Sequence, residues 1–376
     1  MLYRRLGKTG FNVSILGFGC MRLPVRGSKK EIDEEETFQM VGYAMDHGIN
    51  YFDTAYSYHE GKSEVCIGKA LKGHRDQVML ATKLPIKKVK GREDFPRFLD
   101  EQLRRLDTDH LDVYLLHGVN RQVWHKMKAL GVLQFLDQIR AQGLTRYVGF
   151  SFHDDVKIFK EIVDSYDWTL CQIQYNYFDE HYQAGREGMT YAVSKGLGVV
   201  VMEPLRGGQL TDPVPAEVQS VWNEAEEKRS PAEWGLRWVW NQPEVSTVLS
   251  GMSSMGQLME NVRVADHGPG FLSKKDLSVV QKAKEIYKGM LKIGCTGCAY
   301  CMPCPNGVNI PMGFTLYNDL FMFKKPERTI KRYNMTPEQT AAHCTECGEC
   351  EEQCPQHLKI IDELKTVHQT LGRSKS

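Results

Sequence analysis

Short apolar runs alternate with amphipathic stretches along about the first 265 residues of the chain. Eight of these runs are rich in β-branched or aliphatic residues, as buried strands are, and each precedes a helical pattern such as residues 35–46 or 95–106. The predicted strands cover residues 14–19, 50–53, 78–83, 112–117, 147–151, 170–174, 198–202 and 247–250. Strands that alternate with helices run parallel and are buried on both faces, so the pattern predicts an α/β fold, a (β/α)8 TIM barrel.

Two further segments have predicted places in this barrel. Residues 2–13, with a turn at residues 7–10, predict a β-hairpin that closes the bottom of the barrel. Residues 231–240 contain three of the six tryptophans and begin with Pro231, which is favourable at the first helical position. We expect an outer helix whose tryptophans pack inward.

The pattern changes near residue 271 to a lysine-rich helix and then to cysteines, which predicts a barrel domain over 1–270 and a second domain over 271–376. Eight of the eleven cysteines form two runs, and a proline follows the last cysteine of each. The runs are Cys295, Cys298, Cys301 and Cys304, and then Cys344, Cys347, Cys350 and Cys354. This spacing is typical of iron–sulfur cluster ligands.

In ferredoxins with two clusters, the fourth cysteine of each run binds the other cluster. The expected ligand sets are Cys295, Cys298, Cys301 with Cys354, and Cys344, Cys347, Cys350 with Cys304. Two [4Fe-4S] clusters follow. Residues 309–339, between the runs, show no strand pair, so we expect a mainly α-helical ferredoxin-like domain.

Zinc and disulfides are the alternative uses of these cysteines. A zinc site takes four thiolates in two pairs of cysteines. Each run here has four closely spaced cysteines, which is more than such a pair needs. Disulfides are disfavoured because the first residues contain no apolar signal segment, which places the chain in a reducing cytoplasm. Cys20, Cys66 and Cys171 stand alone among apolar residues and are interpreted as buried core thiols.

Charge and hydropathy narrow the classes of partner. The formal net charge is +1, so there is no basic field for nucleic acid. No stretch approaches the roughly twenty apolar residues of a membrane span. We expect a cytoplasmic protein with no membrane or nucleic-acid partner.

Polar residues stand at the C-terminal ends of the predicted strands, where such barrels carry their chemistry. Asp53 and Tyr58 follow the second strand, Lys83 ends the third and His117 ends the fourth. A tyrosine acts as an acid toward a carbonyl oxygen if its pKa is brought down from about 10, and a nearby ammonium does this. We expect Asp53 to keep that ammonium charged and His117 to orient the carbonyl. Taken singly, these residues could instead be a helix cap, packing aromatics or rim residues.

Several separated segments resemble, in order, the motifs of the aldo-keto reductase family. They are Leu16-Gly17-Phe18-Gly19, Tyr51-Phe52-Asp53-Thr54-Ala55 with Tyr58, Gly61-Lys62-Ser63-Glu64, Ala81-Thr82-Lys83 and Asp112-Val113-Tyr114-Leu115-Leu116-His117. The match covers roughly the first two thirds of the chain. It implies that Asp53, Tyr58, Lys83 and His117 form the catalytic tetrad, with Tyr58 as general acid and a nicotinamide as hydride donor.

The resemblance also implies nucleotide contacts. Ser151 and Gln172 match the positions that hold the nicotinamide carboxamide. Phe152 stands where the family usually has an asparagine, and Met202 stands where an aromatic residue usually stacks under the nicotinamide, as an aromatic shelf. The loop 203–208 should meet the pyrophosphate. The implied cofactor-binding residues are Ser151, Gln172, Met202, Glu203, Leu205, Gly207, Ser250, Gly251, Ser253, Gln257, Glu260 and Asn261. Gly251 and Gln257 stand where basic residues often hold a 2′-phosphate, so NADPH is only slightly preferred over NADH.

A nicotinamide moves two electrons as a hydride and a cluster moves one, so a flavin would be the usual converter between them. The sequence shows no flavin motif, but the altered shelf at Phe152 and Met202 could admit a different cofactor.

The leading interpretation is a carbonyl reductase or alcohol dehydrogenase whose clusters serve a redox partner protein. The alternatives are a reductase with purely structural clusters and a non-catalytic electron-transfer or sensory subunit. A small aldehyde, ketone or sugar is the expected substrate. Arg121, Trp124, His125 and Lys128 either line its pocket or form a solvated helix start.

Overall fold

The computed structural model describes residues 1–376 except 28–30, 267–271, 296, 298–299, 355 and 373–376. Internal contacts divide the chain into two compact units. The first comprises Met1–Gly207 and Ala232–Ser273, and the second comprises Gly208–Pro231 and Lys274–Ser376. The segment Gly208–Pro231 therefore belongs with the C-terminal unit, although it precedes residue 270, where the sequence places the domain boundary.

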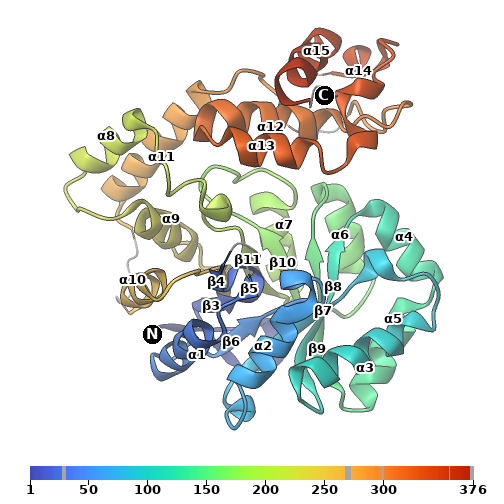
Figure 1. Cartoon of the computed structure of the whole chain (residues 1–376), viewed down its shortest axis with the longest axis vertical. Helices are drawn as coiled ribbons and strands as arrows, with labels where there is room; N and C mark the ends of the chain where they lie inside the picture. Colours follow the sequence, from blue (N-terminus) through green and yellow to red (C-terminus); the bar gives the residue numbers. More distant parts are fainter. Residues whose placement is uncertain (28–30, 267–271, 296, 298–299, 355, 373–376) are drawn as a thin grey trace. The chain divides into compact units, whose positions relative to one another are not determined.

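Eight parallel strands close into a barrel in the first unit (Figure 1). They follow one another around the barrel in chain order, and the last pairs with the first. The strands are β3 (Leu16–Gly19), β6 (Tyr51–Asp53), β7 (Met79–Leu84), β8 (Leu111–Val119), β9 (Thr145–Phe152), β10 (Leu170–Gln174), β11 (Gly198–Met202) and β12 (Thr247–Ser250). All eight predicted strands and the (β/α)8 class are confirmed.

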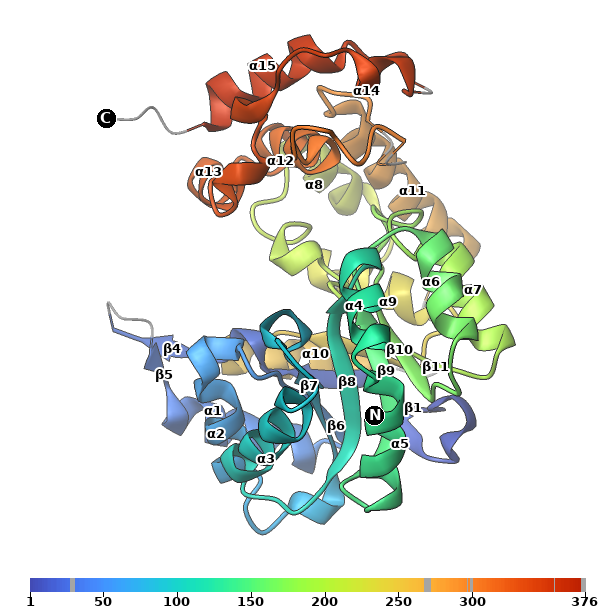
Figure 2. The same cartoon turned by 90° about the vertical axis from the view of Figure 1, so that its right-hand side faces the viewer.

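Helices surround the strands, with α3 against β7 and α5 against β9 (Figure 2). The helices of this unit are α1 (Glu34–Asp46), α2 (Lys62–Ala70), α3 (Asp94–Leu106), α4 (Arg121–Ala129), α5 (Val132–Ala141), α6 (Val156–Asp164), α7 (Gly185–Ser194), α9 (Pro231–Trp240) and α10 (Met255–Ala265). Side chains cap α1, α4, α6 and α10 by accepting hydrogen bonds from N–H groups of the first turn. In α9, Trp234 and Trp240 are fully buried, and Trp238 is buried too, which confirms the predicted inward packing.

A hairpin closes the N-terminal end of the barrel, as predicted. Strands β1 (Tyr3–Arg5) and β2 (Asn12–Ser14) pair antiparallel around the short 3-10 turn η1 (Gly7–Thr9). Leu6 and Val13 are fully buried in one apolar cluster with inward-facing strand residues. Gly7 has φ +50°, and a Cβ there would lie 2.3 Å from the backbone nitrogen of Gly198, so the turn lies directly against the start of β11.

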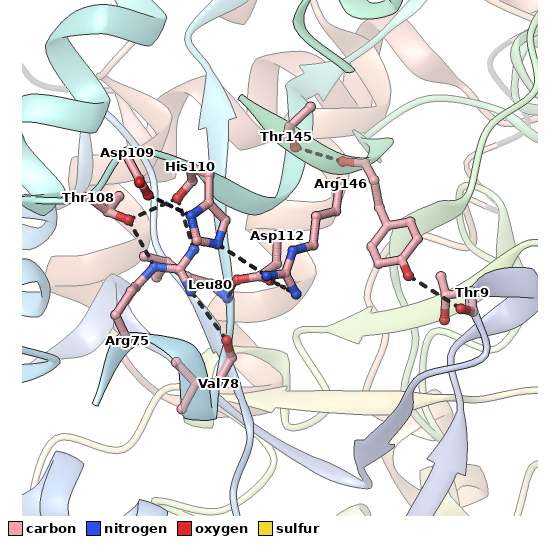
Figure 3. Close-up of polar contacts among 11 residues, drawn as sticks. Thr9, Arg75, Val78, Leu80, Thr108, Asp109, His110, Asp112, Thr145 and Arg146 are labelled. Atoms are coloured by element: carbon pink, nitrogen blue, oxygen red, sulfur yellow. Dashed lines mark hydrogen bonds and ion pairs between the residues drawn. The ribbon is translucent and has the colours of Figure 1, made fainter. Parts of the chain in front are cut away.

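A buried carboxylate joins three strands at the same end of the barrel (Figure 3). Oδ2 of Asp112, on β8, accepts hydrogen bonds from Arg75 Nη1 at 2.7 Å and from the backbone N–H of Leu80, on β7, at 3.0 Å. Arg146 Nη1, on β9, lies 3.3 Å from Asp112 Oδ1. Chemistry in barrels of this type lies at the opposite end, so this network holds the strands in place.

The second unit is helical, as predicted, and its described residues contain no strand. Its helices are α8 (Ala216–Glu224), α11 (Lys274–Gly289), α12 (Ile310–Phe323), α13 (Pro326–Tyr333), α14 (Glu349–Glu352) and α15 (Ile360–Leu371). Helix α12 packs against α13 and α15, and α11 packs against α8. Of the helices built from described residues, none has both the length and the apolar character of a membrane span.

Candidate active site

The strand register brings the predicted catalytic residues to one end of the barrel. Asp53 ends β6 opposite Ala81 on β7, so Lys83, two residues further on, faces the same side. Tyr58 opens the short helix η3 (Tyr58–Gly61), and His117 lies on β8 beside β7. All four side chains meet at the C-terminal rim.

Lys83 is the centre of this group. Its ammonium nitrogen, Nζ, lies 2.5 Å from Asp53 Oδ1, 2.8 Å from the carbonyl oxygen of Thr54 and 3.3 Å from the hydroxyl oxygen of Tyr58. An ammonium has three N–H donors, and each has an acceptor here. Lys83 is fully buried, so these three contacts replace its hydration.

Burial and pairing together set the charge state of Lys83 and Asp53. Burial alone would lower the pKa of Lys83, but the attraction of Asp53 and of Tyr58 raises it above its ordinary value. Burial raises the pKa of Asp53, and the ammonium of Lys83 offsets part of that rise. Lys83 therefore keeps its proton at neutral pH.

The pKa of Tyr58 differs from the expectation. Burial raises the pKa of Tyr58 above its ordinary value, and the ammonium of Lys83 lowers it by a smaller amount. The prediction that Lys83 brings this pKa below about 10 is wrong, because removing the phenol from water outweighs the attraction of a cation 3.3 Å away. Tyr58 is therefore protonated at neutral pH, which is the state that a proton donor needs.

His117 is neutral at the same pH. Burial, and then the positive charges of Lys83, His153 and Lys87, lower the pKa of His117 to about 3. The ring of His117 meets that of Tyr58 edge to face, with 5.8 Å between centroids and 82° between planes. A neutral imidazole retains one N–H donor, so the rim offers two neighbouring donors to an oxygen atom, Tyr58 O–H and His117 N–H.

A buried polar group behind Lys83 was not predicted from the sequence. The side-chain nitrogen of Gln102, on α3, donates to Glu64 Oε1 at 2.6 Å and to the backbone carbonyl of Lys83 at 3.1 Å. Glu64 also accepts from Thr82 at 2.7 Å, and Gln102 accepts from Tyr114 at 2.8 Å. This network holds the end of β7 and so positions Lys83.

A signal for Gln102 is present in the sequence. The buried face of α3 carries Phe95, Phe98, Leu99 and Leu106 at helical spacing, and Gln102 interrupts this apolar stripe. A glutamine on such a stripe must find buried partners, because an unsatisfied amide there is costly.

Ser151, Gln172 and Met202 come together from the three adjacent strands β9, β10 and β11. The sulfur of Met202 lies 4.0 Å from Ser151 Oγ and 3.7 Å from Gln172 Nε2. Gln172 Oε1 is buried and accepts no hydrogen bond from any residue that the structure describes. The amide N–H of a nicotinamide carboxamide would satisfy this oxygen, so these residues fit that group.

Phe152 is not part of this set. It is fully buried, with its ring centroid 5.1 Å from that of Phe159 on α6 and 6.4 Å from that of Phe150. Phe152 thus packs in the layer between strand and helix, and the expectation that it alters the cofactor shelf is wrong. Of the two replacements, only Met202 contacts the predicted carboxamide-binding residues.

The loop after β11 is held in an unusual backbone conformation. Glu203 and Arg206 have φ of +56° and +52°. Asn176 donates to the carbonyl of Glu203 at 3.1 Å, and Arg206 Nε lies 3.2 Å from Asp179 Oδ2. Left-handed residues turn successive N–H groups toward one side, which is how backbone nests bind anions.

Leu205 and Gly207, which the sequence assigns to this loop, fit backbone contacts rather than side-chain contacts. A Cβ added at Gly235 on α9 would lie 2.5 Å from Leu205 Cδ2, so the leucine side chain packs against the helix. Gly207 has no side chain and has φ +63°.

The residues predicted for the adenosine side lie together after β12. Asn261 donates to Ser250 Oγ at 3.0 Å. Gln257 Oε1 accepts from the backbone N–H of Ser253 at 2.9 Å and from its hydroxyl at 3.3 Å. Glu260 lies on the same helix, α10, and is partly exposed. No cation stands at position 251 or 257.

The residues considered for a substrate pocket after β8 do not form one cluster. Arg121 pairs with Asp155 at 3.3 Å, and His125 is exposed. Trp124 is fully buried, and the ammonium of Lys128 lies 5.6 Å from its ring centroid. These contacts match the alternative, a helix start with a solvated face.

A cavity in the second unit collects five of the predicted cluster ligands. Its walls include Cys301, Cys304, Cys344, Cys347 and Cys350. Four of them, Cys344, Cys347, Cys350 and Cys304, make up the complete second ligand set expected from the sequence. A cavity walled by these thiols fits an iron–sulfur cluster, because thiolates are its usual ligands.

The first set is described only in part, because Cys298 lies outside the described residues. Cys295 and Cys354 are half-buried and pack against the apolar cluster built on α12 and α15. The backbone N–H of Gly297 donates to Cys295 Sγ at 3.4 Å. Among the described His, Cys, Asp and Glu residues, no three lie close enough to hold a single metal ion. A cubane does not require this, since its ligands bind at separate corners.

The three remaining cysteines are confirmed as core thiols. Cys20 and Cys171 are fully buried and Cys66 is 1% exposed.

Comparison with known proteins agrees with both halves of the chain. Residues 15–285 match the family model described as Aldo/keto reductase family, and residues 294–359 match a model described as 4Fe-4S dicluster domain.

Individual relatives cover the barrel. The chain is 26% identical over 321 residues to a Bacillus subtilis protein named Uncharacterized oxidoreductase YqkF, covering 77% of this chain and 99% of the relative. It is 29% identical over 283 residues to L-galactose dehydrogenase of Arabidopsis thaliana, covering 69% and 86%. The structure of aldo-keto reductase AKR11C1 from Bacillus halodurans (holo form) is similar with a TM-score of 0.64 and 28% identity, over 75% of this chain and 96% of that one.

Proposed function

The chain belongs to the aldo/keto reductase family and carries a 4Fe-4S dicluster domain, and from this premise we propose that it transfers a hydride between NAD(P)H and a small carbonyl compound. The substrate class is a small aldehyde, ketone or sugar. Its relative named L-galactose dehydrogenase supports the inclusion of sugars.

One observation carries the proposal. The ammonium of Lys83 joins Asp53 at 2.5 Å to the hydroxyl of Tyr58 at 3.3 Å, at the end of the barrel where catalytic groups are found. This contact supports a role in proton transfer, because buried ionisable groups with specific charged partners cluster at functional sites, whereas a solvated rim lysine would not be tied in this way.

The roles of the four residues follow from their charge states. Tyr58 gives its hydroxyl proton to the carbonyl oxygen, and neutral His117 donates a hydrogen bond to the same oxygen. The tyrosinate that remains lies beside the ammonium of Lys83, which stabilises the new negative charge. Asp53 keeps that ammonium in place. A bound nicotinamide would supply the hydride.

The nucleotide would be held by three groups of residues. Ser151, Gln172 and Met202 would hold the nicotinamide, with the orphan oxygen of Gln172 accepting from the carboxamide. Residues 203–207 would meet the pyrophosphate through backbone N–H groups, and residues 250–261 would hold the adenosine.

We further propose that the second unit binds two [4Fe-4S] clusters that exchange electrons with a partner protein. The support is the exposure of Cys347 at the thiol-lined cavity, because a ligand at the surface shortens the path for an electron.

An anaerobic absorbance titration of cluster-loaded protein with NADPH, then with NADH, tests both parts. Bleaching of the iron–sulfur band by either nucleotide would support electronic coupling between barrel and clusters. A steady turnover of carbonyl by cluster-free protein, with the band of the loaded protein unchanged, would instead favour a conventional reductase with structural clusters.

A further inference from the structure

Position 251, where the family often places a cation, is covered by an arginine from another part of the chain. Arg22 ends the short helix η2 (Cys20–Arg22) that follows β3, and β3 pairs with β12, which ends at Ser250. A Cβ added to Gly251 would lie 3.1 Å from Arg22 Cδ and 3.3 Å from its Cγ. The aliphatic part of Arg22 therefore lies directly on the backbone of Gly251.

Two glycines make this arrangement possible. A Cβ at Gly19 would lie 3.1 Å from the carbonyl oxygen of Ser250, so the ends of β3 and β12 approach more closely than larger residues would allow. Glycine at 251 leaves the space that Arg22 fills. A cationic side chain at position 251 would occupy the space that the Arg22 side chain now fills.

Arg22 is partly buried, and its guanidinium forms no hydrogen bond or ion pair with any residue that the structure describes. Other partly buried arginines of the barrel are paired, for example Arg75 with Asp112 at 2.7 Å and Arg105 with Glu64 at 3.2 Å. An unpaired guanidinium presents a planar fork of donors that suits a phosphate.

We propose that Arg22 binds a phosphate group of the nicotinamide nucleotide and supplies, from the short helix after the first barrel strand, the positive charge that positions 251 and 257 lack. This inference rests on the proposed function, since it assigns a residue to the nucleotide site. Under this assignment Arg22 contributes to nucleotide affinity from outside the segment 250–261.

Isothermal titration of the full chain with NADPH and with NADH tests the assignment. We expect Arg22→Ala to weaken NADPH binding by about tenfold to a hundredfold, because a hydrogen bond to a charged group is lost. Arg22→Lys keeps the positive charge and should retain part of the affinity that Arg22→Ala loses. Arg104→Ala removes the same charge from an exposed site on α3 and should bind like the wild type. A loss confined to NADPH identifies the 2′-phosphate, and an equal loss for both nucleotides identifies the pyrophosphate.

A second variant guards against a folding effect. In Gly251→Ala the new methyl group would displace the Arg22 side chain, so the same affinity should fall by a smaller factor. If Arg22→Ala binds both nucleotides as Arg104→Ala does, the assignment of Arg22 is overturned while the proposed function stands. If the wild type binds neither nucleotide, the proposed function fails, and the assignment fails with it.

Discussion

Lys83 Nζ lies 2.5 Å from Asp53 Oδ1, and the two side chains are 0% and 3% exposed. Each charge in such a pair depends on the other, because neither is hydrated. Tyr58 touches the same ammonium, so the charge state of the whole rim follows from this contact.

Asp53→Asn should destabilise the protein strongly. The variant leaves the ammonium of Lys83 buried without a carboxylate, and breaking a buried pair costs about 3 to 5 kcal/mol. Urea unfolding of the two proteins measures the difference. Glu187→Gln is the control, because it breaks an exposed ion pair between Glu187, 65% exposed, and Lys160, 37% exposed. It should leave the unfolding midpoint unchanged. Equal midpoints for Asp53→Asn and wild type would contradict the buried pair.

Tyr58→Phe should abolish most carbonyl reduction without unfolding the barrel. Loss of a general acid lowers the rate by about 10²- to 10⁴-fold, while Lys83 keeps its contacts with Asp53 and Thr54. NADPH oxidation with a panel of small aldehydes, ketones and sugars measures the rate. Tyr56→Phe is the matched control, because that hydroxyl bonds to Glu101 at 3.1 Å, away from Lys83. Undiminished turnover by Tyr58→Phe would exclude Tyr58 as the acid.

Acid should destabilise the barrel in part through His117. Its pKa is about 3 in the folded protein and about 6.5 in an unfolded chain. Between these values the unfolded chain binds the additional proton, so the free energy of unfolding falls as the pH falls, by up to about 1.4 kcal/mol per pH unit.

His117→Gln should remove that contribution. Urea unfolding across this pH range should show a smaller loss of stability for the variant than for the wild type. His125→Gln, which changes an exposed histidine, should follow the wild type. Parallel pH profiles for His117→Gln and wild type would mean that His117 is hydrated in the folded protein.

Gln102→Leu should lower both stability and kcat. The leucine has a similar size but removes the donors to Glu64 and to the carbonyl of Lys83, at a cost of about 1 to 3 kcal/mol. Because Gln102 positions Lys83 and does not reach the substrate, kcat should fall more than KM changes, at temperatures well below unfolding. Gln138→Leu, on the exposed face of α5, should leave both constants unchanged. A change in stability with an unaltered kcat would reduce Gln102 to a packing role.

Cys347→Ser should remove one cluster. Iron analysis of anaerobically purified protein should show about half of the wild-type iron if each ligand set holds one [4Fe-4S] cluster. Cys171→Ala, in the barrel core, should keep the full iron content. Iron that is unaffected by Cys347→Ser would contradict the ligand set of Cys344, Cys347, Cys350 and Cys304.

The strands and most of the candidate site could be predicted from the sequence because their signals are local. A buried parallel strand is marked by a short apolar run, and the ends of such strands meet at one rim. Asp53, Lys83 and His117 could therefore be predicted as a set, although each of them alone could have been a cap or a rim residue. The spacing of the cysteines is equally local, and it predicted the set that lines the cavity in the second unit.

Other features depend on which distant residues meet. The sequence alone could not show that Phe152 packs outward against Phe159, that Gln102 reaches Lys83, or that Arg22 covers Gly251. Nor could the sequence show whether the pKa of Tyr58 is raised or lowered, because the shift is the balance between burial and the charge of Lys83. Spacing along the chain determined which residues stand at the rim of the barrel. Only the tertiary structure decided their partners and charge states, because hydrogen bonds and desolvation depend on distances between segments that are far apart in the sequence.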